Sequence, residues 1–285
     1  MTVFQAKSLA KINLFLHIMG KRKDGYHELD SLVAFTNDVY DIINVELSDQ
    51  YQLVINGPFA NQLATNENII TRTVNLLSQK YHKPPLAKIS LTKNLPIASG
   101  IGGGSSNAAT VIKLLCELWN LSIPNAELIS ICKVIGADVP MFTVNQALYF
   151  NGIGEILTPV KEFLSIYAIL INPGIFISTP EIFKMGLEEY YKSQIYHQYS
   201  FDNQTLISFL KQTQNDLYFN SLQLAPSLSN IVNTLAGFEG CELSRMSGSG
   251  STCFGLFTNI QQAETALKSL QVMFPNYWIK LTTLK

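Results

Sequence analysis

Residues 96–110 read Pro-Ile-Ala-Ser-Gly-Ile-Gly-Gly-Gly-Ser-Ser-Asn-Ala-Ala-Thr, with four glycines between positions 100 and 104. Glycine loses more backbone freedom on folding than any other residue, so this cluster indicates that the backbone closely approaches another group. A glycine-rich loop that leads into a helix is typical of an anion site, because the first N–H groups of the helix point at the ligand. Phosphate is the expected anion. A structural turn between a strand and a buried helix is the alternative.

A helix is expected directly after this loop, because apolar residues recur there at helical spacing. Its N-cap would be Ser105, Ser106 or Asn107, whose side chains can accept hydrogen bonds from the first N–H groups. The helix would end near Asn120. Its buried face would consist of Val111, Leu114, Leu115, Leu118 and Trp119.

The composition indicates a globular protein with one large domain or two smaller ones. The chain has 285 residues, of which 47% are hydrophobic and 14% are charged. A formal net charge of −1 excludes the overall basic field that binds nucleic acid. No apolar run is long enough to span a membrane. The expected partner is therefore a small molecule, with neither nucleic acid nor membrane involved.

Four cysteines show neither metal-ligand spacing nor neighbouring histidines, so they are expected to be reduced core residues. No signal peptide is expected either, and the protein is predicted to be cytoplasmic. The short basic run Lys21-Arg22-Lys23 either helps to hold an anionic ligand or forms a solvated turn.

Strand and helix patterns alternate in an α+β arrangement. The second to fourth strands are expected to form an antiparallel meander, and Asn66 to cap the first helix. Ser178-Thr179-Pro180-Glu181 is expected to form a capping box for a helix that carries Tyr190, followed by a polar loop over residues 191–203. Asn151-Gly152 marks a hairpin.

Strands are expected over residues 11–18, 29–35, 41–47, 51–56, 86–92, 167–171, 241–246, 252–257 and 277–283. Helices are expected over residues 66–81, 124–136, 178–190, 204–212, 228–235 and 261–273.

Three polar residues occupy unusual positions. Lys11 and Asn13 fall on the same face of the first strand, about 7 Å apart, where the alternative to a functional pair is an exposed strand face. Asp138 lies in the apolar run from Gly136 to Pro140. Taken alone it is most simply a turn residue, because an unpaired buried carboxylate would be costly, and a functional base is the alternative.

Several common phosphate-binding patterns do not fit the glycine loop. The Walker A pattern needs Gly-Lys-Ser/Thr where this chain has Gly104-Ser105-Ser106. A dinucleotide fingerprint needs a third glycine where Ser105 stands, and an acid after a following strand. The protein-kinase motifs His-Arg-Asp and Asp-Phe-Gly are absent from the sequence. Small-molecule kinases remain as a class.

The sequence resembles the GHMP kinase superfamily, which includes galactokinase, homoserine kinase and mevalonate kinase. The resemblance implies a two-domain α+β fold, with a domain like ribosomal protein S5 domain 2 over residues 1–160 and a ferredoxin-like domain over residues 161–285. One departure is that Ala98 and Ser99 stand where the family usually has glycines. The matching stretches follow the family order and are Ala10 to Leu16, Asp24 to His27, Pro96 to Thr110, Ile135 to Pro140, Gly152 to Leu157, Thr179 to Phe183 and Met246 to Gly250.

The resemblance also implies which residues form the site. Lys11 and Asp138 match the catalytic pair, in which the aspartate is the base for the substrate hydroxyl and the lysine steadies the developing negative charge. Two aromatic rings, Tyr26 and Phe183, would sandwich a cytosine. The substrate-binding residues would be Asn13, Tyr26, His27, Thr179 and Phe183. The ATP phosphates would be held by Pro96, Ile97, Ala98, Ser99, Gly100, Ile101, Gly102, Gly103, Gly104, Ser105 and Ser106, and backed by the second small-residue loop, Ser247 to Ser251.

Within the superfamily, these motifs are similar to the members that phosphorylate the 2-hydroxyl of 4-diphosphocytidyl-2-C-methyl-D-erythritol, in the non-mevalonate isoprenoid pathway. ATP is the expected cofactor and Mg²⁺ the expected metal, with Ser105 or Ser106 as a candidate ligand. A homoserine or mevalonate kinase is one alternative, although Tyr26 and Phe183 argue against substrates that offer no base to stack. A nucleotide-binding protein without catalysis is the other, and the presence of both Lys11 and Asp138 argues against it.

Overall fold

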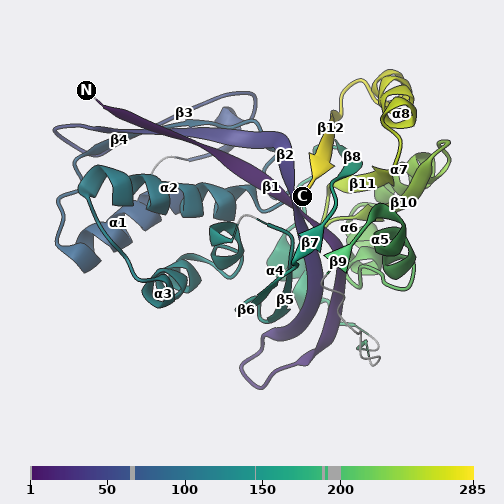
Figure 1. The fold of residues 1–285 in the computed structure, drawn as a ribbon, viewed down its shortest axis with the longest axis horizontal. Helices are drawn as coiled ribbons and strands as arrows, with labels where there is room; N and C mark the ends of the chain where they lie inside the picture. Colours follow the sequence, from purple (N-terminus) through teal and green to yellow (C-terminus); the bar gives the residue numbers. More distant parts are fainter. Residues whose placement is uncertain (1, 65–67, 145, 188–189, 192–199) are drawn as a thin grey trace. The chain divides into compact units, whose positions relative to one another are not determined.

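The computed structural model describes residues 2–64, 68–144, 146–187, 190–191 and 200–285. The chain forms two compact units whose segments alternate along the sequence. Strands β1 (Val3–Lys21) and β2 (His27–Leu47) contribute residues to both units (Figure 1). Unit 1 consists of Met1–Ala10, Val39–Ile97 and Gly102–Asn145. Unit 2 consists of Lys11–Asp38, Ala98–Ile101 and Gln146–Lys285.

Unit 1 is a small sheet covered by helices. The second half of β2 pairs antiparallel with β4, and β4 pairs in parallel with β3. Figure 1 shows the three α-helices together on one face of these strands. Alternation along β4 explains this packing, since Ala87, Ile89 and Leu91 are all buried. The further elements of this unit are β3 (Gln52–Asn56), η1 (Ala60–Gln62), α1 (Ile69–Tyr81), β4 (Ala87–Thr92), α2 (Gly103–Trp119), α3 (Asn125–Ile135) and η2 (Pro140–Thr143).

The structure corrects two predictions in unit 1. Residues 29–47 form one continuous strand, and β3 pairs in parallel with β4, so the predicted antiparallel meander is wrong. The reason is that α1 lies between β3 and β4 and provides the crossover that parallel neighbours need. The cap of α1 is Asn68, whose side chain accepts a hydrogen bond from the Ile70 N–H at 2.9 Å. Asn66, the predicted cap, lies outside the described residues.

Unit 2 is built on antiparallel strands in the order β10-β11-β8-β12-β2, and the β5–β6 hairpin pairs with the first half of β2. Its core joins strand residues such as Ile169 and Phe257 to Leu228 and Ile231 of α7 and Leu270 of α8, all fully buried. The strands are β5 (Leu148–Gly152), β6 (Ile156–Pro159), β7 (Glu162–Phe163), β8 (Ile166–Asn172), β9 (Ser200–Phe201), β10 (Cys241–Met246), β11 (Cys253–Phe257) and β12 (Trp278–Leu284). The helices are α4 (Thr179–Lys184), α5 (Asn203–Leu210), α6 (Tyr218–Leu224), α7 (Ser227–Ala236) and α8 (Ile260–Met273).

Most elements of unit 2 match the predicted ranges, and α4 is the main exception. It ends at Lys184, before Tyr190, because Gly186 adopts a left-handed backbone with a φ of +71°. The predicted capping box does not form, because the Ser178 side chain makes no capping hydrogen bond to the first turn. Helix α6 and the short β7–β9 pair were not predicted. The predicted loop over residues 191–203 contains β9 and the start of α5, and residues 192–199 lie outside the described part.

All four cysteines are free thiols. Among the residues that the structure describes, no cluster of three or more His, Cys, Asp or Glu side chains could hold a metal ion. None of the helices within the described residues could span a membrane.

A buried pair, His17 and Asp216, fastens the turn before α6 to β1. The His17 Nδ1 and Asp216 Oδ1 atoms are 3.2 Å apart, and Asp216 Oδ2 accepts the Ile18 N–H at 2.8 Å. Gln214 Nε2 also donates to this carboxylate, and the Tyr191 ring stacks on the imidazole. Burial alone would raise the pKa of Asp216, but these hydrogen bonds outweigh it and hold the pKa below its ordinary value.

Replacing this carboxylate is expected to lower stability in a pH-dependent way. The variant Asp216→Asn should lose about 1–3 kcal/mol of unfolding free energy at pH 7, the usual effect of disrupting a buried charged hydrogen bond. Because the folded-state pKa is lowered, this stabilisation is present above the unfolded pKa of about 3.9 and disappears as the pH falls through the folded value. Urea unfolding of both proteins between pH 7 and pH 3 measures the difference.

The matched control is Asp24→Asn, because Asp24 pairs with Arg22 at 3.1 Å on the surface. Its unfolding free energy should change by no more than about 0.5 kcal/mol. An Asp216→Asn deficit that stays constant from pH 7 to pH 3 would contradict the assigned role of the ionised carboxylate.

Candidate active site

The glycine loop leads into α2, as predicted, but the helix begins earlier than expected. Its N-cap is Gly102, which has no side chain and adopts a left-handed φ of 69°. Ser105, Ser106 and Asn107 therefore lie inside the helix, and the prediction that one of them caps it is wrong. Their side chains are used elsewhere: Ser106 and Asn107 are buried and hydrogen-bonded within unit 1. A helix start without a side-chain cap suits an anion ligand.

In unit 2, residues 98–101 of the loop lie against the second small-residue loop. The Ser247 hydroxyl donates to the Gly100 carbonyl at 3.1 Å, and the Thr252 N–H donates to the Ser99 carbonyl at 3.1 Å. A Cβ at Gly100 would lie 2.2 Å from the Ser247 carbonyl oxygen, and φ there is +74°. Glycine is therefore required at position 100 both for space and for backbone conformation.

Ala98 also has a positive φ, of 47°. A left-handed conformation costs a non-glycine residue about 1–2 kcal/mol, and this is where the family usually has glycine. Ala98 therefore introduces local backbone strain at the entrance of the loop.

The second small-residue loop, residues 247–251, is held by the side chains of Asn215 and Ser221, which lie outside the family motifs, and of Thr179, which lies within one. Asn215 Nδ2 donates to the carbonyl oxygens of Met246 and Gly248, both at 2.8 Å. The Ser221 hydroxyl donates to the Ser249 carbonyl at 3.0 Å, and the Thr179 and Ser249 hydroxyls are 2.7 Å apart. The family motifs include Thr179 but neither Asn215 nor Ser221, so the sequence did not predict the roles of the last two.

Lys11 and Asn13 form a buried polar pair in unit 2, which excludes the exposed-face alternative. The Lys11 ammonium donates to Asn13 Oδ1, and the two residues are 4% and 1% exposed. Asn13 Nδ2 donates to the Ser31 hydroxyl at 2.9 Å, and the Asn13 N–H donates to the Ser247 hydroxyl at 3.0 Å. The pair is thereby linked through Ser247 to the Gly100 backbone.

The aromatic residues that are predicted to bind the substrate also lie in unit 2. The ring next to Phe183 is that of His27, with centroids 5.3 Å apart, whereas the Tyr26 side chain is exposed. Burial, assisted by the Lys21 ammonium, lowers the pKa of His27, so its ring is neutral at pH 7. The sandwich between Tyr26 and Phe183 stays a prediction.

Asp138 lies half-buried in unit 1, in the turn between α3 and η2. The residues that follow it, Val139 and Pro140, are buried, as the apolar sequence predicted. Since Lys11 belongs to unit 2, the pairing of these two residues stays a prediction.

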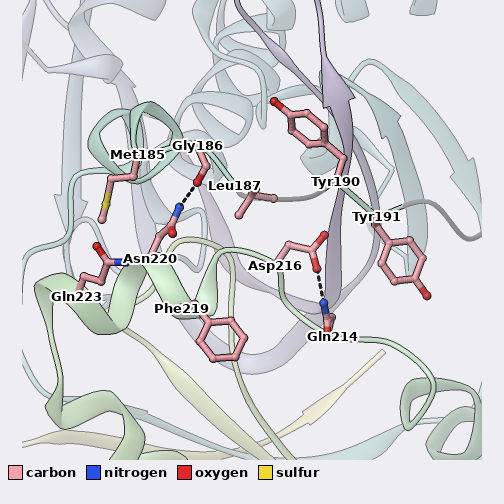
Figure 2. A pocket seen from close by; sticks show the side chains of 10 residues that line it. All are labelled: Met185, Gly186, Leu187, Tyr190, Tyr191, Gln214, Asp216, Phe219, Asn220 and Gln223. Atoms are coloured by element: carbon pink, nitrogen blue, oxygen red, sulfur yellow. Dashed lines mark hydrogen bonds between the residues drawn. The ribbon is translucent and has the colours of Figure 1, made fainter.

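Unit 2 also contains a cavity of about 780 Å³, shown in Figure 2. None of its ten lining residues is a predicted site residue. Asp216 is the one charged side chain among these ten, so the lining offers no cation for a phosphate. The lining residues are Met185, Gly186, Leu187, Tyr190, Tyr191, Gln214, Asp216, Phe219, Asn220 and Gln223.

Two family patterns match the chain. The GHMP kinases N terminal domain matches residues 68–146, and the GHMP kinases C terminal domain matches residues 203–276. The predicted division after residue 160 falls between these matches and stays a prediction.

Relatives that match over nearly the full length share one name. The chain is 40% identical to 4-diphosphocytidyl-2-C-methyl-D-erythritol kinase of Roseobacter denitrificans over 282 residues, or 96% of this chain and 91% of that one. It is 37% identical to the kinase of the same name from Rhodospirillum rubrum over 270 residues, or 94% of this chain and 88% of that one.

Solved structures agree with these relatives. A crystal structure of 4-(cytidine 5'-diphospho)-2C-methyl-D-erythritol kinase superposes with a TM-score of 0.78 at 28% identity, covering 99% of both chains. A homoserine kinase from Cytophaga hutchinsonii reaches 0.72 at 13% identity, covering 100% of this chain and 95% of that one, and shows the fold alone. The expected α+β GHMP kinase fold is confirmed. The chain belongs to the GHMP kinase family, in the branch of the 4-diphosphocytidyl-2-C-methyl-D-erythritol kinases.

Proposed function

We propose that the protein transfers the γ-phosphoryl group of ATP to the 2-hydroxyl of 4-diphosphocytidyl-2-C-methyl-D-erythritol. The 40% identity to a kinase of that name over 96% of the chain is the observation that carries the proposal. A cytoplasmic location is part of it, supported by four free cysteines.

The ATP phosphates bind at the glycine loop, residues 96–106, in this proposal. Support comes from the start of α2, where the glycine N-cap leaves the first turn open to an anion and the helix dipole favours negative charge. Within unit 2, Gly100 of the same loop is in contact with Ser247 of the 247–251 loop. Phosphoryl transfer needs chiefly such positioning and charge neutralisation.

The acceptor is activated by Asp138 and oriented by Lys11. Asp138 takes the proton of the 2-hydroxyl, and the Lys11 ammonium steadies the negative charge that develops on that oxygen. The Lys11 ammonium is buried and donates to Asn13, whose side chain is itself fixed by a hydrogen bond to Ser31. A buried ammonium held by a fixed acceptor supports an orienting role. These assignments rest on the family motifs for both residues.

The cytidine end of the acceptor is assigned to Asn13, Tyr26, His27, Thr179 and Phe183. The contact between the His27 and Phe183 rings supports a flat aromatic surface on which a base can stack. A neutral His27 can both donate and accept hydrogen bonds to such a base.

Mg²⁺ is the proposed metal, and it would neutralise phosphate charge during transfer. Ser105 is the better of the two candidate ligands. Its side chain is half-buried, whereas the Ser106 hydroxyl is buried and accepts a hydrogen bond from Ser8 at 2.8 Å.

Removal of the proposed base is expected to stop transfer but spare nucleotide binding. The variant Asp138→Ala should lower kcat at least 100-fold, the low end of general-base effects, with the KM for ATP within threefold of wild type. A coupled ADP-release assay with the cytidylyl alcohol, homoserine and mevalonate as acceptors measures both the activity and its specificity. Glu127→Gln on α3 serves as a control acid and should leave kcat unchanged. Turnover by Asp138→Ala at the wild-type rate would refute the assigned base.

Loss of the Phe183 ring is expected to weaken the acceptor much more than ATP. Stacking of one base contributes about 1–3 kcal/mol, so Phe183→Ala should raise the acceptor KM at least fivefold and leave the ATP KM within twofold. Phe183→Leu keeps apolar volume and should show the same split. Phe176→Ala, at an exposed phenylalanine, is the matched control. Equal increases of both KM values would argue against the stacking role.

Two opposite substitutions test the backbone of the ATP loop. Gly100→Ala should destabilise the protein by at least about 2 kcal/mol and raise the KM for ATP, because of the left-handed backbone and the clash with the Ser247 carbonyl. Ala98→Gly relieves a similar strain but adds chain entropy, so stability should change by less than about 1 kcal/mol. Urea unfolding and initial rates measure these effects, and a tolerated Gly100→Ala would contradict the described loop.

A further inference from the structure

The Asp41 carboxylate, on β2 in unit 1, is fully buried and accepts four hydrogen bonds. Its Oδ1 accepts the N–H groups of Asn94 at 2.7 Å and Leu95 at 2.9 Å. Its Oδ2 accepts from the Lys93 ammonium and from Asn107 Nδ2, the latter at 2.9 Å. Bonds to an ionised acceptor are stronger than those between neutral groups.

These donors come from both ends of the glycine loop. Asn94 and Leu95 directly precede Pro96, the first residue of the loop, and Asn107 directly follows Ser106, its last. One carboxylate therefore fixes where the backbone enters the loop and where α2 leaves it.

Further contacts hold the first turn of α2 to the same cluster. Asn107 Nδ2 also donates to the Ser8 hydroxyl at 2.9 Å, and that hydroxyl donates to Ser106. A Cβ at Gly103 would lie 3.0 Å from the Lys93 ammonium nitrogen, so the ammonium packs directly beneath the helix start.

A gain in folding stability is a weak explanation for the buried Asp41–Lys93 ion pair. Burial lowers the pKa of Lys93, and its attraction to Asp41 offsets only part of that desolvation. Apolar or neutral groups in place of a buried ion pair are often equally stable, whereas a fixed pair imposes one geometry on whatever it contacts.

We propose that Asp41, Lys93 and Asn107 are positioning residues that set the shape of the ATP-phosphate loop by clamping its two ends. Their side chains are buried, so they act through the loop backbone. The inference rests on the proposed function, because it takes residues 96–106 as the ATP-phosphate site.

The test separates loop geometry from fold stability by calorimetric titration with two probes, the β,γ-imido analogue of ATP and cytidine diphosphate. Asp41→Asn leaves the buried Lys93 without its counter-ion, and Asp41→Asn/Lys93→Met removes that unpaired charge. Both variants should bind the ATP analogue at least tenfold more weakly than wild type and cytidine diphosphate within twofold. The double variant should recover most of the melting temperature that the single variant loses.

A matched control is the Glu46–Lys88 ion pair, which joins the same strands, β2 and β4, at 2.8 Å on the surface. Glu46→Gln/Lys88→Met should bind the ATP analogue as wild type does. Asn107→Ala keeps the Asp41–Lys93 pair but removes the hydrogen bond from the first turn of α2 to Asp41. It should therefore show the same tenfold loss of affinity for the ATP analogue, even if the double variant fails to fold.

Recovery of ATP affinity together with melting temperature in the double variant would overturn the proposal, as would wild-type affinity in Asn107→Ala. If the wild-type protein binds the ATP analogue but not cytidine diphosphate, the proposed substrate is refuted. The effect of the clamp residues on ATP-analogue affinity can then still be measured. If wild type binds no ATP analogue, the clamp proposal falls with the ATP site.

Discussion

The buried Asp41 carboxylate is the constraint on which the geometry of unit 1 depends. A glycine-rich loop has little tendency to hold one conformation, because glycine gives up the most chain entropy on folding. Four hydrogen bonds to one carboxylate fix both ends of the loop, so the freedom that remains lies in the residues between them. The start of α2 can then present its N–H groups without a side-chain cap.

In unit 2, neutral hydrogen-bonding groups hold the loop backbone in place. Asn215 and Ser221 donate to carbonyl oxygens of the 247–251 loop, and Ser247 in turn donates to Gly100. The same Ser247 hydroxyl accepts the Asn13 N–H, next to the buried Lys11. A kinase needs the reacting groups to be positioned before transfer, and these hydrogen bonds fix the backbone around the residues that the family motifs single out.

Sequence periodicity predicted most of the strands and helices, since long segments such as α2 and α8 bury regular apolar faces. Helix-capping rules based on local sequence gave wrong predictions where the side chain bonds to a residue far away in the chain. Ser106 and Asn107 are good capping residues, yet they bond to Ser8 and Asp41 instead. Asp41 and Lys93 are 52 positions apart and carry no local signature, so their pairing could not be predicted. The motifs found Lys11, Asn13 and Thr179, whereas Asn215 and Ser221 needed the fold.

Phosphorus NMR of the reaction mixture tests whether the phosphoryl group is transferred to the 2-hydroxyl, because it identifies the hydroxyl that receives the group. Carbon 2 of 2-C-methylerythritol carries no hydrogen, so a phosphate on its oxygen has no three-bond coupling to a carbon-bound proton. We expect the γ-phosphate signal of ATP to decline as an equal phosphomonoester singlet appears. A phosphomonoester signal split by carbon-bound protons would contradict transfer to the 2-hydroxyl, and no consumption of ATP with the cytidylyl alcohol present would contradict the proposed reaction.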